Sequence, residues 1–328
     1  MDQTPVDLPD FDDVLAAAAR IAPHAHVTPV LRSRGLDAIA GCALHFKCEP
    51  LQRAGAFKFR GACNAVWALA DDEAARGVVT HSSGNHGAAL ALAASTRGIP
   101  CHVVVPEGAV AAKLAAIEAN GAILHPCAPT MAAREDTAAR VQRETGARFV
   151  HPYTDPLVIA GQGTAMLELL NANGGFDVVV APVGGGGLAS GCALVLAARA
   201  PGCELLLAEP AGAADTARSL AAGRRDVDFV PDTICDGLRG TLGQPGFEIL
   251  RAQRARVAVV EDAATIAAMR LLWTRLKLLV EPSSAVALAA VLQQRERLAG
   301  KRVGVVLSGG NVDPESAARW FASAAAVA

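Results

Sequence analysis

The chain has 328 residues and a hydrophobic fraction of 52%, which is enough for one large or two medium-sized domains with buried cores. Its formal net charge is only −2, so the composition excludes a strongly basic surface for nucleic acid or acidic lipid. Its eight cysteines contain no CxxC pair and lie mostly in apolar runs, which predicts buried free thiols in a reducing cytoplasm.

No targeting or membrane-spanning segment is predicted. Residues 1–5 lack the basic and apolar regions of a signal peptide. Residues 178–198 are uncharged over about the length of a membrane span, but Pro182 and four glycines interrupt them, and a strand–loop–helix accounts for them better. We therefore expect a cytoplasmic protein with no membrane or nucleic-acid partner.

Apolar strands and helices are predicted to alternate along the chain. This alternation indicates an α/β fold in which helices cover both faces of parallel sheet. The predicted helices are 12–20, one that starts at Lys58, 85–97, 110–119, 131–145, 157–171, 188–199, 213–222, 262–276, 283–297 and 314–326. The predicted strands are 43–48, 77–81, 101–105, 122–125, 148–150, 177–181, 204–208, 257–260 and 302–307.

The first candidate site is the run of four glycines at 184–187, which follows an apolar strand and precedes a helix. Its backbone N–H groups have no side-chain cover and lie beside a helix N-terminus, an arrangement that favours an anion such as phosphate. A flexible linker or close helix packing is the alternative, but linkers rarely separate two strongly apolar elements. No Lys-Ser/Thr pair follows, so we expect a phosphate ligand other than a nucleoside triphosphate.

The second candidate is Lys58, which lies between Phe57 and Phe59 at a predicted helix start. An amine in an apolar, cationic setting has a lowered pKa, which Schiff-base chemistry needs. Taken alone, a lysine at a helix start is usually a solvated surface residue. Together with a phosphate site, however, it indicates pyridoxal phosphate, a cofactor that requires one of each.

Eight motifs that agree with a pyridoxal-phosphate enzyme are spread over almost the whole chain. They are GAFKFRGA at 55–62, HSSGNHG at 81–87, HPYTDPLVIAGQGT at 151–164, PVGGGGLASG at 182–191, AEP at 208–210, DGLRG at 236–240, EPSSAVALAAVL at 281–292 and LSGGNVD at 307–313. The set resembles the fold type II pyridoxal-phosphate enzymes (tryptophan synthase β-like) of the serine/threonine dehydratase (ammonia-lyase) and serine racemase family. The resemblance implies two parallel-sheet α/β domains with the active site in the cleft. It implies a large cofactor-binding domain of residues 1–68 and 150–328, and a small inserted domain of residues 69–149.

The resemblance also implies roles for individual residues. Lys58 binds the cofactor and acts as the base at Cα. Ser308 faces the pyridine nitrogen, and because a hydroxyl leaves that nitrogen largely unprotonated, β-elimination is favoured over transamination. The remaining cofactor contacts come from Phe57, Asn85, Gly184, Gly185, Gly186, Gly187 and Leu188. The substrate carboxylate is expected at the loop that contains Ser82, Ser83, Asn85 and His86, although ordinary helix capping by serine is the alternative there.

Two further assignments depend on the resemblance. Ser83 stands where many dehydratases carry alanine, and its hydroxyl can return a proton to the face opposite Lys58, as serine racemases do; otherwise it only fills space. Glu209 and Asp215, with the carbonyl of Ala213, are expected to bind Mg²⁺ or Ca²⁺ as a structural ion. The alternative for Asp215 is a helix cap.

Departures from the family pattern limit these assignments. Gly240 stands where many relatives carry serine or threonine, which leaves room for a larger side chain. Ala88 stands where animal racemases carry a glutamine of the nucleotide effector site, which argues against regulation by ATP.

We expect a homodimeric enzyme with a small amino-acid substrate that converts L-threonine or L-serine to a 2-oxo acid and ammonia by β-elimination. The alternatives are a serine racemase, or an ammonia-lyase acting on another β-hydroxy amino acid such as 3-hydroxyaspartate or phenylserine.

Overall fold

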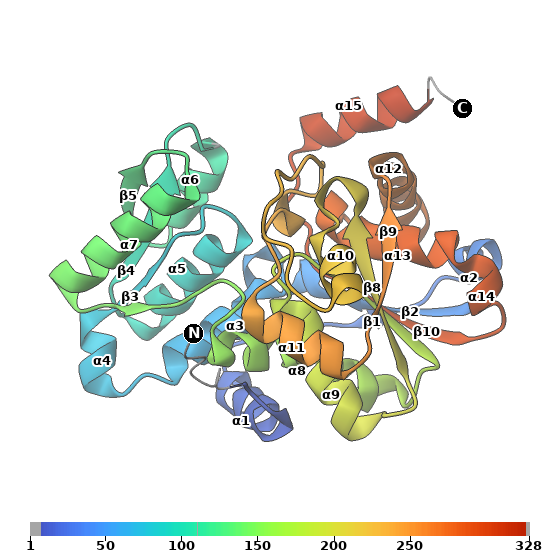
Figure 1. Cartoon of the computed structure of the whole chain (residues 1–328), viewed down its shortest axis with the longest axis horizontal. Coiled ribbons are helices and arrows are strands. Elements are labelled where there is room, and N and C mark those ends of the chain that lie inside the picture. Colours follow the sequence, from blue (N-terminus) through green and yellow to red (C-terminus); the bar gives the residue numbers. More distant parts are fainter. Residues whose placement is uncertain (1–7, 110, 326–328) are drawn as a thin grey trace.

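The computed structural model describes residues 8–109 and 111–325, so residues 1–5 considered above lie outside the described part. The described residues form two β-sheets with helices packed on both faces of each (Figure 1). The predicted α/β class is therefore confirmed.

The larger sheet has six strands in the order β1-β2-β10-β7-β8-β9. All neighbours are parallel except β1 and β2, which form an antiparallel edge. The strands are β1 (Val30–Leu31), β2 (Ala43–Cys48), β7 (Val178–Pro182), β8 (Glu204–Pro210), β9 (Arg256–Val260) and β10 (Arg302–Leu307).

The smaller sheet has four parallel strands in the order β5-β4-β3-β6. They are β3 (Val78–Thr80), β4 (Cys101–Pro106), β5 (Ile123–Cys127) and β6 (Arg148–Phe149). All four fall within residues 69–149, the proposed small domain. The division of the chain at these two positions stays a prediction.

Helices connect the strands (Figure 1). The α-helices are α1 (Phe11–Ile21), α2 (Arg34–Ala40), α3 (Lys58–Trp67), α4 (Asp71–Arg76), α5 (Asn85–Arg97), α6 (Ala111–Glu118), α7 (Met131–Thr145), α8 (Pro156–Asn173), α9 (Gly187–Arg199), α10 (Asp215–Ala222), α11 (Gln244–Ala252), α12 (Asp262–Leu271), α13 (Pro282–Gln293), α14 (Arg295–Leu298) and α15 (Pro314–Ala325). Short helical turns are η1 (Glu49–Leu51), η2 (Arg53–Gly55), η3 (Ala211–Ala213), η4 (Asp236–Leu238) and the π-helix η5 (Leu272–Leu276).

Three short α-helices and strand β1 were not predicted. Helix α2 has local signals that explain it, since Ser33 caps its start and Gly41 ends it in the left-handed conformation with φ 70°. The predicted helix 262–276 is α12 followed by η5, and the predicted helix 283–297 is divided into α13 and α14.

Burial on both faces explains why the central strands are continuously apolar. All five residues of β7 are buried, and successive side chains point to opposite faces. Val178 and Val180 belong to a cluster with residues of α13, while Val179 and Ala181 belong to one with residues of α8 and α9. The helices thus hold the strand ends in fixed positions on either side.

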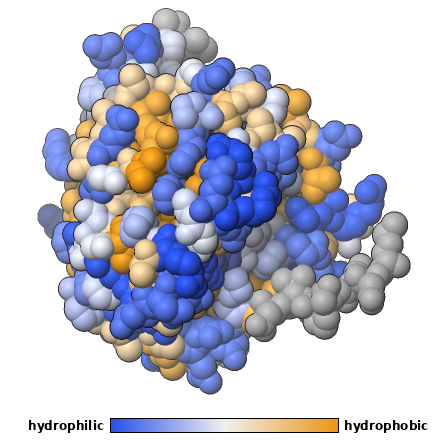
Figure 2. Space-filling view, turned by 90° about the vertical axis from the view of Figure 1, so that its left-hand side faces the viewer, coloured by the Kyte–Doolittle hydropathy of each residue, from blue (hydrophilic) through white to orange (hydrophobic). Residues whose placement is uncertain are grey.

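Figure 2 views the molecule from the side of the smaller sheet. On this face hydrophilic side chains surround small groups of apolar ones. No helix within residues 8–109 and 111–325 is long and apolar enough to cross a membrane.

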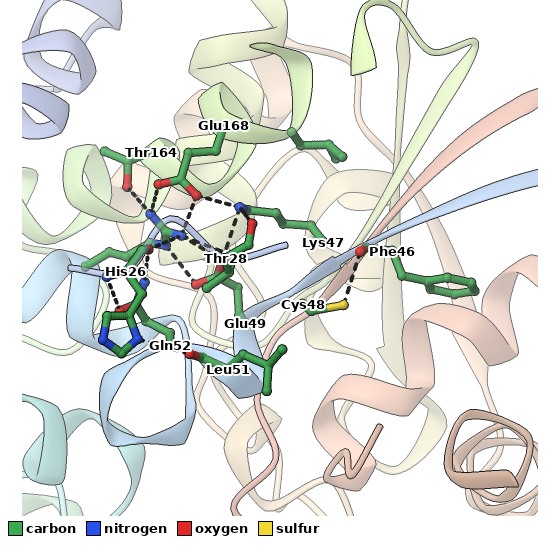
Figure 3. A network of polar contacts seen from close by, with 12 residues as sticks. His26, Thr28, Phe46, Lys47, Cys48, Glu49, Leu51, Gln52, Thr164 and Glu168 are labelled. Atoms are coloured by element: carbon green, nitrogen blue, oxygen red, sulfur yellow. Dashed lines mark hydrogen bonds and ion pairs between the residues drawn. The ribbon is translucent and has the colours of Figure 1, made fainter. Parts of the chain in front are cut away.

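A buried network of charged side chains joins β2, α3 and α8. Arg60 Nε donates to Glu49 Oε2 at 2.7 Å, and Arg60 Nη1 donates to Glu168 Oε1 at 2.6 Å. Lys47 Nζ contacts the other oxygen of Glu168 at 2.5 Å, and Thr28 donates to Glu49 (Figure 3). The side chains of Lys47, Glu49 and Arg60 are completely buried. Because each buried charge has a partner of opposite sign, the network fixes the position of α3.

Candidate active site

A cavity of about 600 Å³ lies where loops from both sheets meet. Four of these loops follow the carboxyl ends of β3, β4, β7 and β10, where ligands of parallel sheets bind. All twelve residues predicted to bind cofactor or substrate line this one cavity: Phe57, Lys58, Ser82, Ser83, Asn85, His86, Gly184, Gly185, Gly186, Gly187, Leu188 and Ser308.

Lys58 is the first residue of α3 and points into the cavity. Its Nζ donates to the carbonyl of Pro152 at 2.8 Å and lies 5.2 Å from the centre of the Phe57 ring. Burial lowers the pKa of Lys58 to about 8, although the nearby Glu281 carboxylate acts in the opposite direction. The lowered pKa agrees with the prediction, and it makes the amine available as a nucleophile or base near neutral pH.

The glycine loop between β7 and α9 needs its glycines for two reasons. Gly186 has φ 93°, a conformation that other residues rarely adopt. A Cβ atom at Gly184 would stand 2.8 Å from Cα of Leu238, and one at Gly185 would stand 2.4 Å from the ring of Tyr153. The loop therefore exposes backbone amides at the N-terminus of α9, which fits a phosphate group.

Asn85 starts α5 and has a fixed amide orientation. Its Nδ2 donates to both carboxylate oxygens of Glu281, at 3.0 and 3.2 Å. The side chain of Asn311 donates to Asn85 Oδ1 at 3.0 Å, so the Nδ2 group faces Glu281 and the cavity. Burial raises the pKa of Glu281 to about 7, and the charge of Asp236 adds to this effect. Glu281 begins one of the eight motifs, but the sequence predicted no role for it.

Ser308 and His86 complete the floor and wall of the cavity. Ser308 follows β10, and its carbonyl accepts the N–H of Phe57 at 2.9 Å, which ties the last strand to the lysine turn. The Ser308 hydroxyl lies 3.4 Å from the carbonyl of Ser283. The His86 ring lies 3.2 Å from the carbonyl of Val150, and burial holds its pKa well below the usual value. The imidazole is therefore neutral and held in the wall.

Cationic side chains from the smaller sheet's side face the same cavity. Lys113 on α6 forms an ion pair with Asp236 on η4, between the two sheets. Arg134 on α7 lines the cavity, and its buried Nε has no hydrogen-bond partner among the residues described. Arg134 was not predicted from the sequence, because a single arginine on a helix is not distinguished from a solvated surface residue.

Glu209 and Asp215 lie together outside the cavity lining. Glu209 accepts the N–H groups of Thr216 and Ala217 at 2.7 and 2.9 Å, so Glu209 caps the first turn of α10. Asp215 accepts the N–H of Leu242 at 2.8 Å through Oδ2, while its buried Oδ1 has no partner within the described residues. Burial raises the pKa of Glu209 to about 7 and that of Asp215 to about 6.

This pair fits a hard cation only in part. An unpaired buried carboxylate oxygen suits Mg²⁺ or Ca²⁺. However, within residues 8–109 and 111–325 no group of three or more His, Cys, Asp or Glu side chains could hold a metal ion. Backbone carbonyls such as that of Ala213, together with water, would have to complete the coordination.

The fold and the cavity define an α/β enzyme that holds a phosphate-bearing cofactor beside a lysine amine. Known proteins give the same assignment. The model of the family described as "Pyridoxal-phosphate dependent enzyme" matches residues 21–309, and the chain belongs to this family, with the type II fold.

Three similar proteins carry different activities in their names. The β-hydroxyaspartate dehydratase of Paracoccus denitrificans (strain Pd 1222) is 48% identical over 93% of this chain and 97% of its own length. The structure of maize serine racemase has a TM-score of 0.91 and 43% identity, over 97% of this chain and 98% of that chain. The structure of a threonine deaminase from T.th. has a TM-score of 0.88 and 43% identity, over 93% and 99% respectively.

The lowered pKa of Lys58 predicts how the cofactor attaches. The rate at which pyridoxal phosphate binds covalently to the cofactor-free enzyme should rise with pH through a midpoint near pH 8 and then level off, because the amine is largely unprotonated above its pKa. Absorbance spectroscopy in the visible range measures this rate. Free butylamine is the control, and its rate of reaction with pyridoxal phosphate should keep rising up to about pH 10, because its amine has an unshifted pKa. Lys58→Ala should show no covalent attachment, and a rate in the parent that climbs steadily to pH 10 would contradict the assignment.

Proposed function

We propose that this protein eliminates water from 3-hydroxyaspartate, and that hydrolysis of the released enamine product gives a 2-oxo acid and ammonia. The observation that carries this choice is Arg134: the residue lines the cavity, and its buried Nε has no hydrogen-bond partner among the described residues. A guanidinium nitrogen buried without a partner costs free energy, and an anion that pairs with it removes this cost. The second carboxylate of 3-hydroxyaspartate supplies that anion, whereas serine, threonine and phenylserine have none. The dehydratase name of the Paracoccus relative supports the same substrate.

In this proposal, different residues of the cavity bind the cofactor, bind the substrate and transfer the proton. Bound pyridoxal phosphate supplies the electron sink that stabilises negative charge at Cα. Lys58 removes the proton from Cα, and its lowered pKa suits this role. The backbone amides near Ser82 and Ser83 hold the α-carboxylate. The cofactor is held by Phe57, Asn85, Gly184, Gly185, Gly186, Gly187, Leu188 and Ser308.

Racemisation of serine is the second candidate, and Ser83 favours it. Its hydroxyl lines the same cavity as Lys58, and two proton-transfer groups on opposite faces of Cα are what inversion requires. The serine racemase name of the maize relative supports this candidate. The two activities use the same cofactor and base, so one protein can have both.

The choice of substrate predicts a selective effect of Arg134→Gln. The loss of a charge-assisted contact of about 1.5–3 kcal/mol should lower kcat/KM for 3-hydroxyaspartate by roughly 10- to 100-fold. The value for serine should change less than about threefold, since serine makes no such contact. Arg140→Gln is the matched control, because Arg140 lies on the same helix and forms an exposed pair with Glu144. Equal losses for both substrates would count against a distal carboxylate at Arg134.

The two candidate reactions should separate in Ser83→Ala. Formation of D-serine should fall by about 10²–10⁴-fold, the usual cost of a lost proton-transfer group. Elimination needs only the Lys58 face and should remain substantially intact. Chiral analysis of serine measures the first reaction, and a 2-oxo acid assay measures the second. If racemisation survives the substitution, Ser83 only fills space.

We also propose a divalent cation at Glu209, Asp215 and the carbonyl of Ala213. Mg²⁺ or Ca²⁺ bound only by the folded state should raise the melting temperature, and a chelator should reverse this. Asp215→Asn should remove the response, whereas Asp313→Asn, at an exposed carboxylate, should keep it. An enzyme that contains no bound metal and shows no response in the parent would contradict the site. A homodimer in the cytoplasm stays a prediction.

A further inference from the structure

Tyr153 is the only tyrosine in the chain, and it lies in the wall of the cavity. It belongs to the turn between β6 and α8. The same turn carries Pro152, whose carbonyl accepts the hydrogen bond from Lys58 at 2.8 Å. Tyr153 has no role in the reaction proposed above.

The turn is held rigidly by His151. Its Nδ1 accepts the backbone N–H groups of Tyr153 and Thr154 at 3.3 and 3.1 Å. The His151 ring stands edge-on to the Tyr153 ring, with centroids 4.5 Å apart. Burial lowers the pKa of His151 to about 3, so the imidazole is neutral and Nδ1 remains an acceptor. The direction of the tyrosine ring is thus fixed by its own turn.

Gly185 makes room for the ring, and Gly240 lies against it at ordinary contact distance. A Cβ atom at Gly185 would stand 2.4 Å from ring carbons of Tyr153. A Cβ atom at Gly240 would stand 3.4 Å from Tyr153 Cε1, 3.7 Å from the phenol oxygen and 3.8 Å from the backbone nitrogen of Gly185. The phenol oxygen therefore lies beside Gly240 and close to the glycine loop.

The hydroxyl of Tyr153 is available as a donor. Within residues 8–109 and 111–325 it makes no hydrogen bond. Burial raises the pKa of the phenol, so the O–H group keeps its proton at neutral pH. A protonated donor beside exposed backbone amides adds to their affinity for an anion.

We propose that the Tyr153 hydroxyl donates a hydrogen bond to an anionic ligand oxygen in the cavity beside the glycine loop. The oxygen belongs either to the phosphate of the cofactor or to the distal carboxylate of the substrate. Only the second source rests on the proposed function; the first depends on cofactor binding alone.

Tyr153→Phe tests the proposal without turnover. If the oxygen belongs to phosphate, the variant should bind pyridoxal phosphate about 10-fold or more weakly, while its affinity for pyridoxal, which lacks phosphate, stays unchanged. If it belongs to the substrate, cofactor affinity stays unchanged, and KM for 3-hydroxyaspartate rises about 10-fold relative to serine. Thr241→Val is the control, because it removes a hydroxyl from the neighbouring cavity. Gly240→Ser in the Tyr153→Phe background should restore part of the lost affinity, since it returns a hydroxyl to the same space.

The single tyrosine allows a direct measurement as well. Incorporation of 3-fluorotyrosine gives one ¹⁹F resonance, which reports only on this site. The resonance should shift when pyridoxal phosphate or 3-hydroxyaspartate binds, according to the source, and pyridoxal alone should have a smaller effect. If Tyr153→Phe changes neither cofactor affinity nor the KM ratio, and the resonance does not respond, the proposal is overturned. If the cofactor arm succeeds but 3-hydroxyaspartate is not turned over, the proposed substrate fails and Tyr153 retains its role.

Discussion

The buried pairing of Arg60 with Glu49 and Glu168 is the constraint on which the site depends. Arg60 lies two residues after Lys58 on α3, and its partners lie on η1 and α8. Removing one partner from such a network typically costs about 3–5 kcal/mol, because a buried charge is left uncompensated. The chain therefore cannot shift α3 without breaking the pairing. Lys58 is therefore held against Pro152 by an ion-pair network whose members do not line the cavity.

The parallel sheets bring the rest of the site to Lys58. Strand β7 delivers the glycine loop, β10 delivers Ser308, and β3 in the other sheet delivers Ser83. The contact between Asn85 and Glu281 and the pair of Lys113 with Asp236 connect the two groups of loops. These polar contacts hold the two groups of loops together across the cavity.

Local patterns explain which features could be predicted from the sequence. The glycine loop lies between a strand and a helix, and the lysine turn lies at a helix start. In both cases residues that are adjacent in the sequence are enough to predict the feature. Glu281, Arg134 and Tyr153 are different, because they come together only after the chain has folded. Tyr153 and Gly185 are far apart in the sequence, yet the Tyr153 ring occupies the space that a Cβ atom at position 185 would need. Short elements such as α2 were missed, since seven residues carry too little periodicity.

Two ionisable groups of the cavity, Lys58 and Glu281, lower the free energy of unfolding near neutral pH. The pKa of Lys58 falls to about 8, so the folded state loses a proton there that the unfolded chain keeps, and stability rises with pH between about 8 and 10.5. The pKa of Glu281 rises to about 7, so stability falls as pH rises between about 4.5 and 7. Both penalties are therefore complete between pH 7 and 8. The paired charges around Arg60 lie outside the cavity lining, so they position α3 without contacting the groups whose pKa values are shifted.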